Sequence, residues 1–180
     1  MMKKVLLIAS SSRKNGNTDL LAQQFAKGAE ESGNKVEMLY LRDYKFGYCL
    51  GCWVCSNNGG DCVQKDDINH LYPKLLEADV IVFAAPTYFY SIDGRMKTFF
   101  DRMVTIYGRM HDKDFYYITA SQSNSREDIE SVFTAFHGFA RCFSDIREKG
   151  RIYGVGADKK GDVKNTAAYQ EAYEMGKTIV

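Results

Sequence analysis

The amino-acid sequence predicts an α/β fold, an open parallel β-sheet with helices on both faces. Apolar runs typical of strands alternate about five times with segments of helical periodicity along the 180 residues. The runs at residues 5–9 and 80–84 are continuously apolar, as in strands buried on both faces. No repeat, linker or low-complexity tract interrupts the pattern, so we expect residues 1–180 to form one domain.

The expected elements follow one another in a regular order. The five strands are expected at residues 5–9, 36–41, 80–84, 115–119 and 152–155. Apolar residues recur at helical spacing at residues 21–29, 129–136 and 168–179. Ser91 is the expected N-cap of the helix after the third strand, and Asp66 or Asp67 that of the helix before it. Pro73 lies inside that earlier helix and predicts that it is short or kinked.

Composition excludes several classes of function. The net charge is +1, and the 24 basic residues are interspersed with 23 acidic ones, so we expect no nucleic-acid or membrane partner. The apolar run at residues 5–9 is shorter than the core of a secretory signal, and no window reaches the length of a membrane span. We therefore expect a cytoplasmic protein with reduced thiols.

The segment ASSSRKNGNTDLL, residues 9–21, joins the first strand to the first helix. Backbone N–H groups and the helix dipole favour an anion there. Side-chain donors are present at Ser10, Ser12, Asn17 and Thr18. Gly16 permits a tight turn, and Arg13 offsets negative charge. Neither dinucleotide nor Walker glycines occur, so the loop indicates a terminal phosphomonoester; the alternative is a polar surface loop before a capped helix.

The segment AAPTYFYSIDGRMKTFFDRM follows the third strand, which Pro86 is expected to end. Three aromatic side chains at 88–90 lie beside backbone amides there, an arrangement that suits a flat heteroaromatic ring. The alternative is that these aromatics belong to the core or to a dimer contact. A phosphate loop on the neighbouring strand favours a ligand with both a phosphate and a flat ring.

Together, SSSRKNGNT and APTYFYSIDGRMKTFFDR resemble the flavodoxin-like NADPH-dependent FMN reductase family, which includes the iron–sulfur flavoproteins. The resemblance covers about residues 3–120. It implies a three-layer flavodoxin-like fold with a five-stranded parallel sheet in the order 2-1-3-4-5, and a homodimer or homotetramer. In this sheet the ligand lies at the carboxyl ends of the strands, where the strand order reverses.

The resemblance also implies the residues that would bind FMN. The phosphate would be held by Ser10, Ser12, Asn17 and Thr18, with Arg13 and Lys14 beside it. The ring would be bordered by Pro86, Thr87, Tyr88, Phe89 and Tyr90, and along its other edge by Ala120, Ser121 and Gln122. Relatives often carry glycines in that last loop, whereas ASQSNS has none.

A third unusual loop contains four cysteines, Cys49, Cys52, Cys55 and Cys62, spaced C-x2-C-x2-C-x6-C. This spacing suits a [4Fe–4S] cluster and resembles the motif of the iron–sulfur flavoproteins. Many flavoproteins of the wider family have a similar loop without a cluster, and zinc or a redox disulfide is the third alternative. Cys142 lies in a helical pattern and is expected in the core.

The remaining polar residues are not expected to be catalytic. His70, His111 and His137 lack metal-ligand spacing, and Lys97 with Asp101 is an i, i+4 surface pair. GVGADKKG is expected to be a strand-to-helix turn. No Ser–His–Asp or Cys–His arrangement is supported by the spacing, so hydrolysis is not predicted.

We therefore expect an FMN-dependent NAD(P)H oxidoreductase that reduces a quinone, free flavin or similar small acceptor. The flavin N5 would carry the chemistry, without a catalytic side chain. The alternative is an iron–sulfur flavoprotein that carries electrons from ferredoxin to FMN through a [4Fe–4S] cluster on the four cysteines. A response regulator is disfavoured, because residues 9–11 and 84–86 lack its acidic side chains.

Overall fold

The computed structural model describes residues 1–60 and 62–180, and it confirms the predicted α/β architecture. The parallel sheet has the order β2-β1-β3-β5-β6, which is the predicted order 2-1-3-4-5. Its strands are β1 (Lys4–Ala9), β2 (Lys35–Tyr40), β3 (Val80–Tyr88), β5 (His111–Ala120) and β6 (Ser144–Gly154). The sheet has six strands rather than the predicted five, because β4 (Ser91–Ile92) pairs antiparallel with the end of β3.

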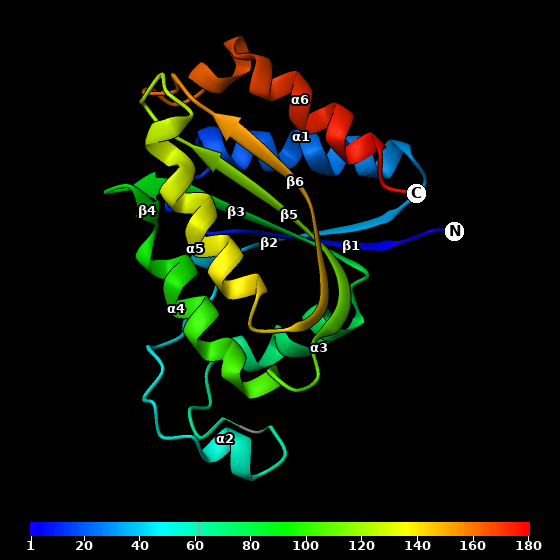
Figure 1. Cartoon of the computed structure of the whole chain (residues 1–180), viewed down its shortest axis with the longest axis vertical. Coiled ribbons are helices and arrows are strands. Elements are labelled where there is room, and N and C mark those ends of the chain that lie inside the picture. Colours follow the sequence, from blue (N-terminus) through cyan, green and yellow to red (C-terminus); the bar gives the residue numbers. More distant parts are fainter. Residues whose placement is uncertain (61) are drawn as a thin grey trace.

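Helices cover both faces of the sheet (Figure 1). One face carries α1 (Asn17–Glu31) and α6 (Ala167–Lys177), and the other carries α3 (Tyr72–Glu77), α4 (Gly94–Arg102) and α5 (Glu130–Ala140). The short helix α2 (Val54–Asn57) lies away from the sheet, in the four-cysteine loop. Single turns of 3₁₀ helix are η1 (Leu41–Asp43), η2 (Asp67–His70), η3 (Met103–Ile106), η4 (Glu127–Ile129) and η5 (Asp162–Asn165).

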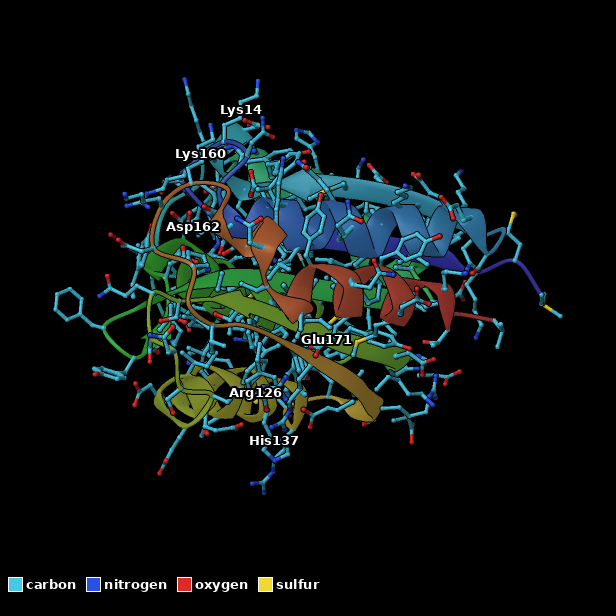
Figure 2. All side chains as sticks on the ribbon, turned by 90° about the horizontal axis from the view of Figure 1, so that it is seen from above. Lys14, Arg126, His137, Lys160, Asp162 and Glu171 are labelled. Carbon is cyan, nitrogen blue, oxygen red and sulfur yellow. The ribbon has the colours of Figure 1, made fainter. Side chains whose placement is uncertain are left out.

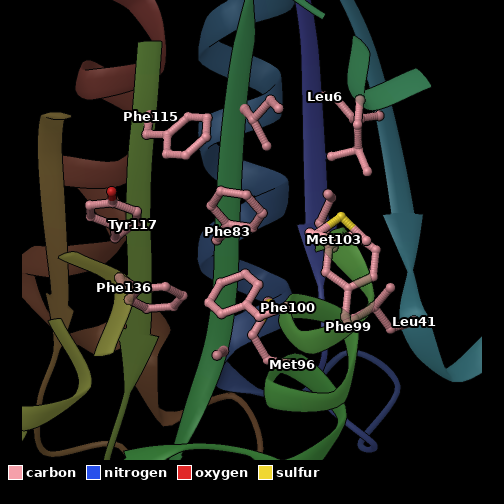
Figure 3. Close-up of a cluster of buried hydrophobic side chains, with 14 of the residues drawn as sticks. Leu6, Leu41, Phe83, Met96, Phe99, Phe100, Met103, Phe115, Tyr117 and Phe136 are labelled. Atoms are coloured by element: carbon pink, nitrogen blue, oxygen red, sulfur yellow. The ribbon is translucent and has the colours of Figure 1, made fainter. Parts of the chain in front are cut away.

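Each face of the sheet has its own apolar core. Along β1, side chains alternate between the two cores, with Leu7 on the side of α1 and Leu6 on the other. Figure 3 shows the second core, in which Phe83 of β3 lies at the centre. Its ring centroid is 5.2 Å from that of Phe100 and 5.1 Å from that of Phe115, both edge to face. These contacts hold β3 against α4, and the aromatic loop, residues 86–93, connects these two elements.

Several details differ from the sequence predictions. Neither Asp66 nor Asp67 caps α3, which begins at Tyr72, because the 3₁₀ turn η2 lies between them and that helix. β3 does not end at Pro86 but continues through it, and Pro86 pairs with Ala120 of β5. Proline has no N–H to donate, but none is needed toward β1, because β1 pairs with β3 only as far as Ala84. Asp93, not Ser91, caps α4: its carboxylate accepts hydrogen bonds from the backbone of Arg95 at 3.0 Å and of Met96 at 3.3 Å.

Cys142 is exposed rather than in the core, because α5 ends at Ala140 and the next turn reaches the surface. The helix that contains Pro73 is short, as predicted, with the proline in its first turn. Lys97 and Asp101 form the expected exposed pair, with 2.6 Å between Nζ and Oδ1. No helix in the described residues has the length and apolarity needed to cross a membrane.

Candidate functional site

A cavity of about 540 Å³ opens at the carboxyl edge of the sheet, between the loops that follow β1, β3, β5 and β6. This volume is typical of sites for small molecules and cofactors. The lining residues are Ser11, Arg13, Gly16, Asn17, Thr18, Pro86, Thr87, Tyr88, Phe89, Tyr90, Ala120, Ser121, Gln122, Ser123, Asp128, Ala157 and Asp158. The phosphate loop and the aromatic loop, which the sequence predicted separately, therefore border one cavity.

The N-terminus of α1 forms one end of this cavity. Its N-cap residue is Gly16, and in the described chain no side chain caps the helix. The first-turn N–H groups of α1 therefore lack a capping side chain, which favours binding of an anion. Gly16 is closely packed, since a Cβ there would lie 3.0 Å from the Arg13 carbonyl oxygen. The alternative of an ordinary side-chain cap is not observed.

The predicted phosphate ligands divide into two groups. Arg13, Asn17 and Thr18 line the cavity, whereas Ser10, Ser12 and Lys14 do not. The buried Ser10 hydroxyl donates instead to the Asp93 carboxylate, and the Ser12 hydroxyl accepts from the Arg95 guanidinium at 3.2 Å. These two serines join the phosphate loop to the first turn of α4.

The Asn17 side chain also binds protein groups. Its amide nitrogen donates to the carbonyl oxygens of Ala157 at 3.0 Å and Lys159 at 2.9 Å. Its oxygen accepts from the backbone N–H of Gly161 at 2.9 Å. Asn17 thus fastens the loop after β6 to the start of α1, and Figure 2 shows Lys14 and Lys160 at the same end of the molecule. The sequence predicts a turn for this loop, but carries no signal that Ala157 and Asp158 line the cavity.

A buried ion pair supports the phosphate loop from behind. One guanidinium nitrogen of Arg42 lies 2.9 Å from the Asp19 carboxylate and 3.0 Å from the Ser11 carbonyl oxygen. Asp19 is fully buried and also accepts from the Asn15 backbone at 2.9 Å. Burial raises the pKa of Asp19 above its ordinary value, although Arg42 and the Asn15 N–H oppose this shift. The sequence shows an acidic residue, Asp19, in the first turn of the helix, but it does not show that Arg42 of η1 is its partner.

The aromatic hairpin borders the opposite side of the cavity. Tyr88, Phe89 and Tyr90 are exposed by 44%, 102% and 65%, so these rings are not part of the core. The Thr87 and Thr119 hydroxyls are 3.0 Å apart and join β3 to β5, and Thr87 also lines the cavity. Exposed aromatic faces beside an anion-binding helix end fit a ligand with a flat ring and a phosphate.

The loop after β5 forms its turns with serines instead of glycines. The backbone N–H of Ser123 donates to the Ser121 hydroxyl at 3.2 Å, and that of Ser125 to the Ser123 hydroxyl at 3.1 Å. The N–H of Glu127 donates to the Ser125 hydroxyl at 3.2 Å. These side-chain turns replace the glycines that related loops often carry. They present residues 120–123 to the cavity.

The four-cysteine loop lies at the other end of α4 from the cavity (Figure 1). Its thiols are free, with Cys55 buried, Cys52 exposed, and Cys49 and Cys62 half-buried. Among residues 1–60 and 62–180, no three His, Cys, Asp or Glu side chains are placed to hold a metal ion. A [4Fe–4S] cluster is therefore not shown by the arrangement of the cysteines in the described residues.

Arg102 joins the two ends of this loop, Gly47 and Asp66, and its side chain is 1% exposed. Its guanidinium binds both carboxylate oxygens of Asp66, at 2.8 and 3.0 Å, and the Gly47 carbonyl oxygen at 2.9 Å. It also lies 3.4 Å from Cys62 Sγ. Burial alone would raise the pKa of Asp66, but the hydrogen bonds from Arg102 and Gly47 lower it below its ordinary value. No local sequence pattern marks Arg102 as buried, so its role was not predicted.

The fold defines a flavodoxin-like protein whose cavity lies at the carboxyl edge of the sheet. A family model described as NADPH-dependent FMN reductase matches residues 3–142, and the chain belongs to this family. The sequence resemblance on which the FMN prediction depends is thereby confirmed.

Among curated relatives, an iron–sulfur flavoprotein of Archaeoglobus fulgidus is 38% identical over 101 residues, which are 56% of this chain and 46% of that protein. The chain thus spans about half the length of the curated relatives it matches. An azoreductase structure from Bacillus anthracis str. Sterne superposes with a TM-score of 0.76 at 17% identity, covering 99% of this chain and 100% of that one.

A second similar structure is an FMN-dependent NADH-azoreductase from Bacillus anthracis str. Ames Ancestor in complex with FMN. It has a TM-score of 0.72 and 15% identity and covers 97% of this chain and 98% of that one. At these identities the two structures establish the shared fold alone.

Proposed function

We propose that the chain is a single FMN-binding domain that oxidises NAD(P)H and reduces a quinone, free flavin or similar small acceptor. The observation that carries this proposal is the cavity itself, with the uncapped end of α1 on one side and the aromatic hairpin on the other. Family membership and a similar fold that binds FMN in a related structure support it. The overall reaction converts NAD(P)H, a proton and a quinone into NAD(P)⁺ and the hydroquinone.

The proposed roles of the chain's residues are binding and positioning. The first-turn N–H groups of α1, with Thr18 and Arg13, would hold the phosphate, and residues 86–90 and 120–122 would border the ring. Ser10, Ser12 and Asn17 would act indirectly, through the contacts that keep the phosphate loop in place. Bound FMN supplies a hydride acceptor and a two-electron donor, so no side-chain acid or base is required.

Titration of the apoprotein with FMN and with riboflavin tests the site. We expect FMN to bind at least tenfold more tightly, because riboflavin lacks the phosphate. Anaerobic addition of NADPH and NADH to the loaded protein then tests the reaction, with bleaching of the flavin absorbance expected. Failure to take up FMN would refute the site, and binding without bleaching by either nucleotide would refute the reductase function.

The second candidate function is an iron–sulfur flavoprotein that carries electrons between ferredoxin and FMN. The cysteine spacing and the printed names of several relatives favour it, whereas the placement of the cysteines does not. Iron and acid-labile sulfide assays on anaerobically purified protein decide between the candidates. About four irons per chain that are lost on Cys52→Ala and Cys55→Ala would establish the cluster; negligible iron would exclude it.

We also propose a homodimer or homotetramer in the cytoplasm, in line with the family resemblance. Sedimentation equilibrium of the FMN-loaded protein tests the assembly. A species with the mass of one chain at micromolar concentration would contradict it.

A further inference from the structure

Asp19 places a buried negative charge in the first turn of α1, beside the proposed phosphate site. Its carboxylate accepts a hydrogen bond from the backbone N–H of Asn15 at 2.9 Å. In a capping box, the side chain of the third helical residue accepts from the N–H of the N-cap residue, which is Gly16 in α1. Asp19 instead holds Asn15, one residue earlier, whose φ of 54° is left-handed. The phosphate loop is thus fixed by a group that, left unpaired, would repel an anion.

Arg42 of η1 balances this charge. One of its guanidinium nitrogens lies 2.9 Å from the Asp19 carboxylate. The Arg42 side chain is 14% exposed, so little solvent screens the two charges from nearby groups. The guanidinium also stacks on the ring of Tyr40, with Cζ 4.1 Å from the ring centroid, and this contact fixes its position. Because the pair carries no net charge, Asp19 can hold the loop without repelling a phosphate.

Arg42 also orients one peptide group of the phosphate loop. The same guanidinium nitrogen donates to the carbonyl oxygen of Ser11 at 3.0 Å. The Ser11–Ser12 peptide is trans, so its N–H points in the opposite direction, away from Arg42. Ser11 lines the cavity, and its carbonyl oxygen is drawn toward the protein side of the loop. This oxygen therefore does not present its negative end to a bound phosphate.

We propose that Arg42 is a positioning residue that determines specificity for the phosphate half of the ligand. It acts through Asp19 and the Ser11 carbonyl, without touching the ligand itself. This inference rests on the proposed function, since it requires FMN to bind in the cavity with its phosphate at the start of α1. The affinity for FMN should then follow the charge of the Asp19–Arg42 pair, whereas the affinity for riboflavin, which has no phosphate, should not.

Three variants change the charge of this pair in different directions. Arg42→Met leaves the carboxylate unpaired, Asp19→Asn leaves the guanidinium unpaired, and the double variant removes both charges. The matched control is Arg147→Met, which removes the same charge from the protein. Arg147 binds the Asp114 carboxylate near the amino ends of β5 and β6, away from the cavity.

The apoproteins are titrated with FMN and with riboflavin by fluorescence quenching, at about pH 8.5. Burial raises the pKa of Asp19 and Arg42 opposes this shift, so the higher pH favours an ionised carboxyl in Arg42→Met. We expect the Kd for FMN to rise about 10- to 100-fold in Arg42→Met and to fall about threefold in Asp19→Asn. The double variant should return to within about fivefold of the parent.

The Kd for riboflavin should stay within about twofold of the parent in all of these variants, and Arg147→Met should change neither constant. Circular dichroism establishes that each variant is folded. A Kd for FMN in Arg42→Met within about twofold of the parent, or equal losses for the two flavins, would overturn the inference. The pair would then support the fold alone.

Asp19→Asn gives an independent decision if Arg42→Met does not fold. A higher Kd for FMN in this variant would overturn the inference, because the unpaired guanidinium should attract the phosphate. Failure of the proposed function has a different signature. In that case the parent itself does not take up FMN, or binds it no more tightly than riboflavin.

Discussion

Gly28 of α1 and Gly176 of α6 lie where the two helices cross, and each occupies a place that has no room for a side chain. A Cβ on Gly28 would stand 2.1 Å from the Tyr173 carbonyl oxygen, and one on Gly176 would stand 2.1 Å from that of Phe25. Both obstacles are backbone atoms, so a rotamer change cannot relieve the clash. The separation of α1 from α6 is therefore set by these two glycines.

Gly28→Ala should lower the free energy of unfolding by about 3 kcal/mol, because α6 must move to admit the methyl group. Urea denaturation monitored by circular dichroism measures the change. Gly138→Ala in α5 is the matched control, since a Cβ there meets nothing within 4 Å. The same substitution should there stabilise by about 0.5–1 kcal/mol through helix propensity alone. A loss of stability at both positions would contradict the crossing argument.

Thr18→Val should weaken FMN binding about 10- to 100-fold, which is the effect of losing a hydrogen bond to a charged group. Thr18 is 2% exposed and lines the cavity at the start of α1, and valine has nearly the same shape. Riboflavin affinity is the control and should not change. Fluorescence quenching titrations give both constants, and an equal loss for the two ligands would show that the hydroxyl does not contact the phosphate.

Asn17→Ala should release the loop after β6 from the start of α1. The amide groups of Gly161 and Val163 lose their acceptor, the Asn17 side-chain oxygen, which lies 2.9 and 3.4 Å from them. Hydrogen exchange of the loop should accelerate by at least tenfold, while exchange in β1 and β3 stays at the parent rate. Unchanged exchange in residues 157–163 would mean that other contacts hold the loop.

Asp93→Asn should change how stability depends on pH. Burial raises the pKa of Asp93 above its ordinary value of 3.8, although hydrogen bonds from Ser10, Met96 and Arg95 oppose the shift. The folded protein then binds more protons at this site than the unfolded chain, so the carboxyl destabilises the fold as pH rises above about 4. We therefore expect the free energy of unfolding of the parent, relative to that of Asp93→Asn, to decrease as the pH rises from about 4 to the folded-state pKa of Asp93. A difference that is constant over this range would contradict the shift.

Arg102→Ala should destabilise the protein by about 3–5 kcal/mol, because it leaves Asp66 without its buried partner. Cys62 should also become more accessible to a thiol reagent. A double-mutant cycle with Asp66→Asn isolates the pair, and we expect the double variant to be less destabilised than the sum of the single ones. Strict additivity would show that the two side chains act independently.

The sheet and the two loops that border the cavity could be predicted from the sequence, because both depend on local patterns. Apolar runs marked the strands, and the loops after β1 and β3 carried their own chemical signals. The repeated serines at 121, 123 and 125 are an equally local signal, because each of these hydroxyls accepts a hydrogen bond from a backbone N–H two residues on.

The roles of Ser10 and Asn17 could not be read from local pattern. Ser10 was expected to face a phosphate, yet its hydroxyl binds Asp93, 83 residues away. Asn17 binds the backbone of Gly161, 144 residues away. A hydroxyl or an amide can satisfy a ligand or a distant loop equally well, and only the tertiary arrangement determines which partner it meets.

Each end of α4 is hydrogen-bonded to a different loop. At its start, Arg95 is bonded to the Ser10 carbonyl oxygen at 3.3 Å, and at its end Arg102 is bonded to Gly47, at one end of the cysteine loop. Nine helical residues make a strut about 13 Å long that does not bend easily. The phosphate loop and the four-cysteine loop are therefore anchored to opposite ends of the same short helix.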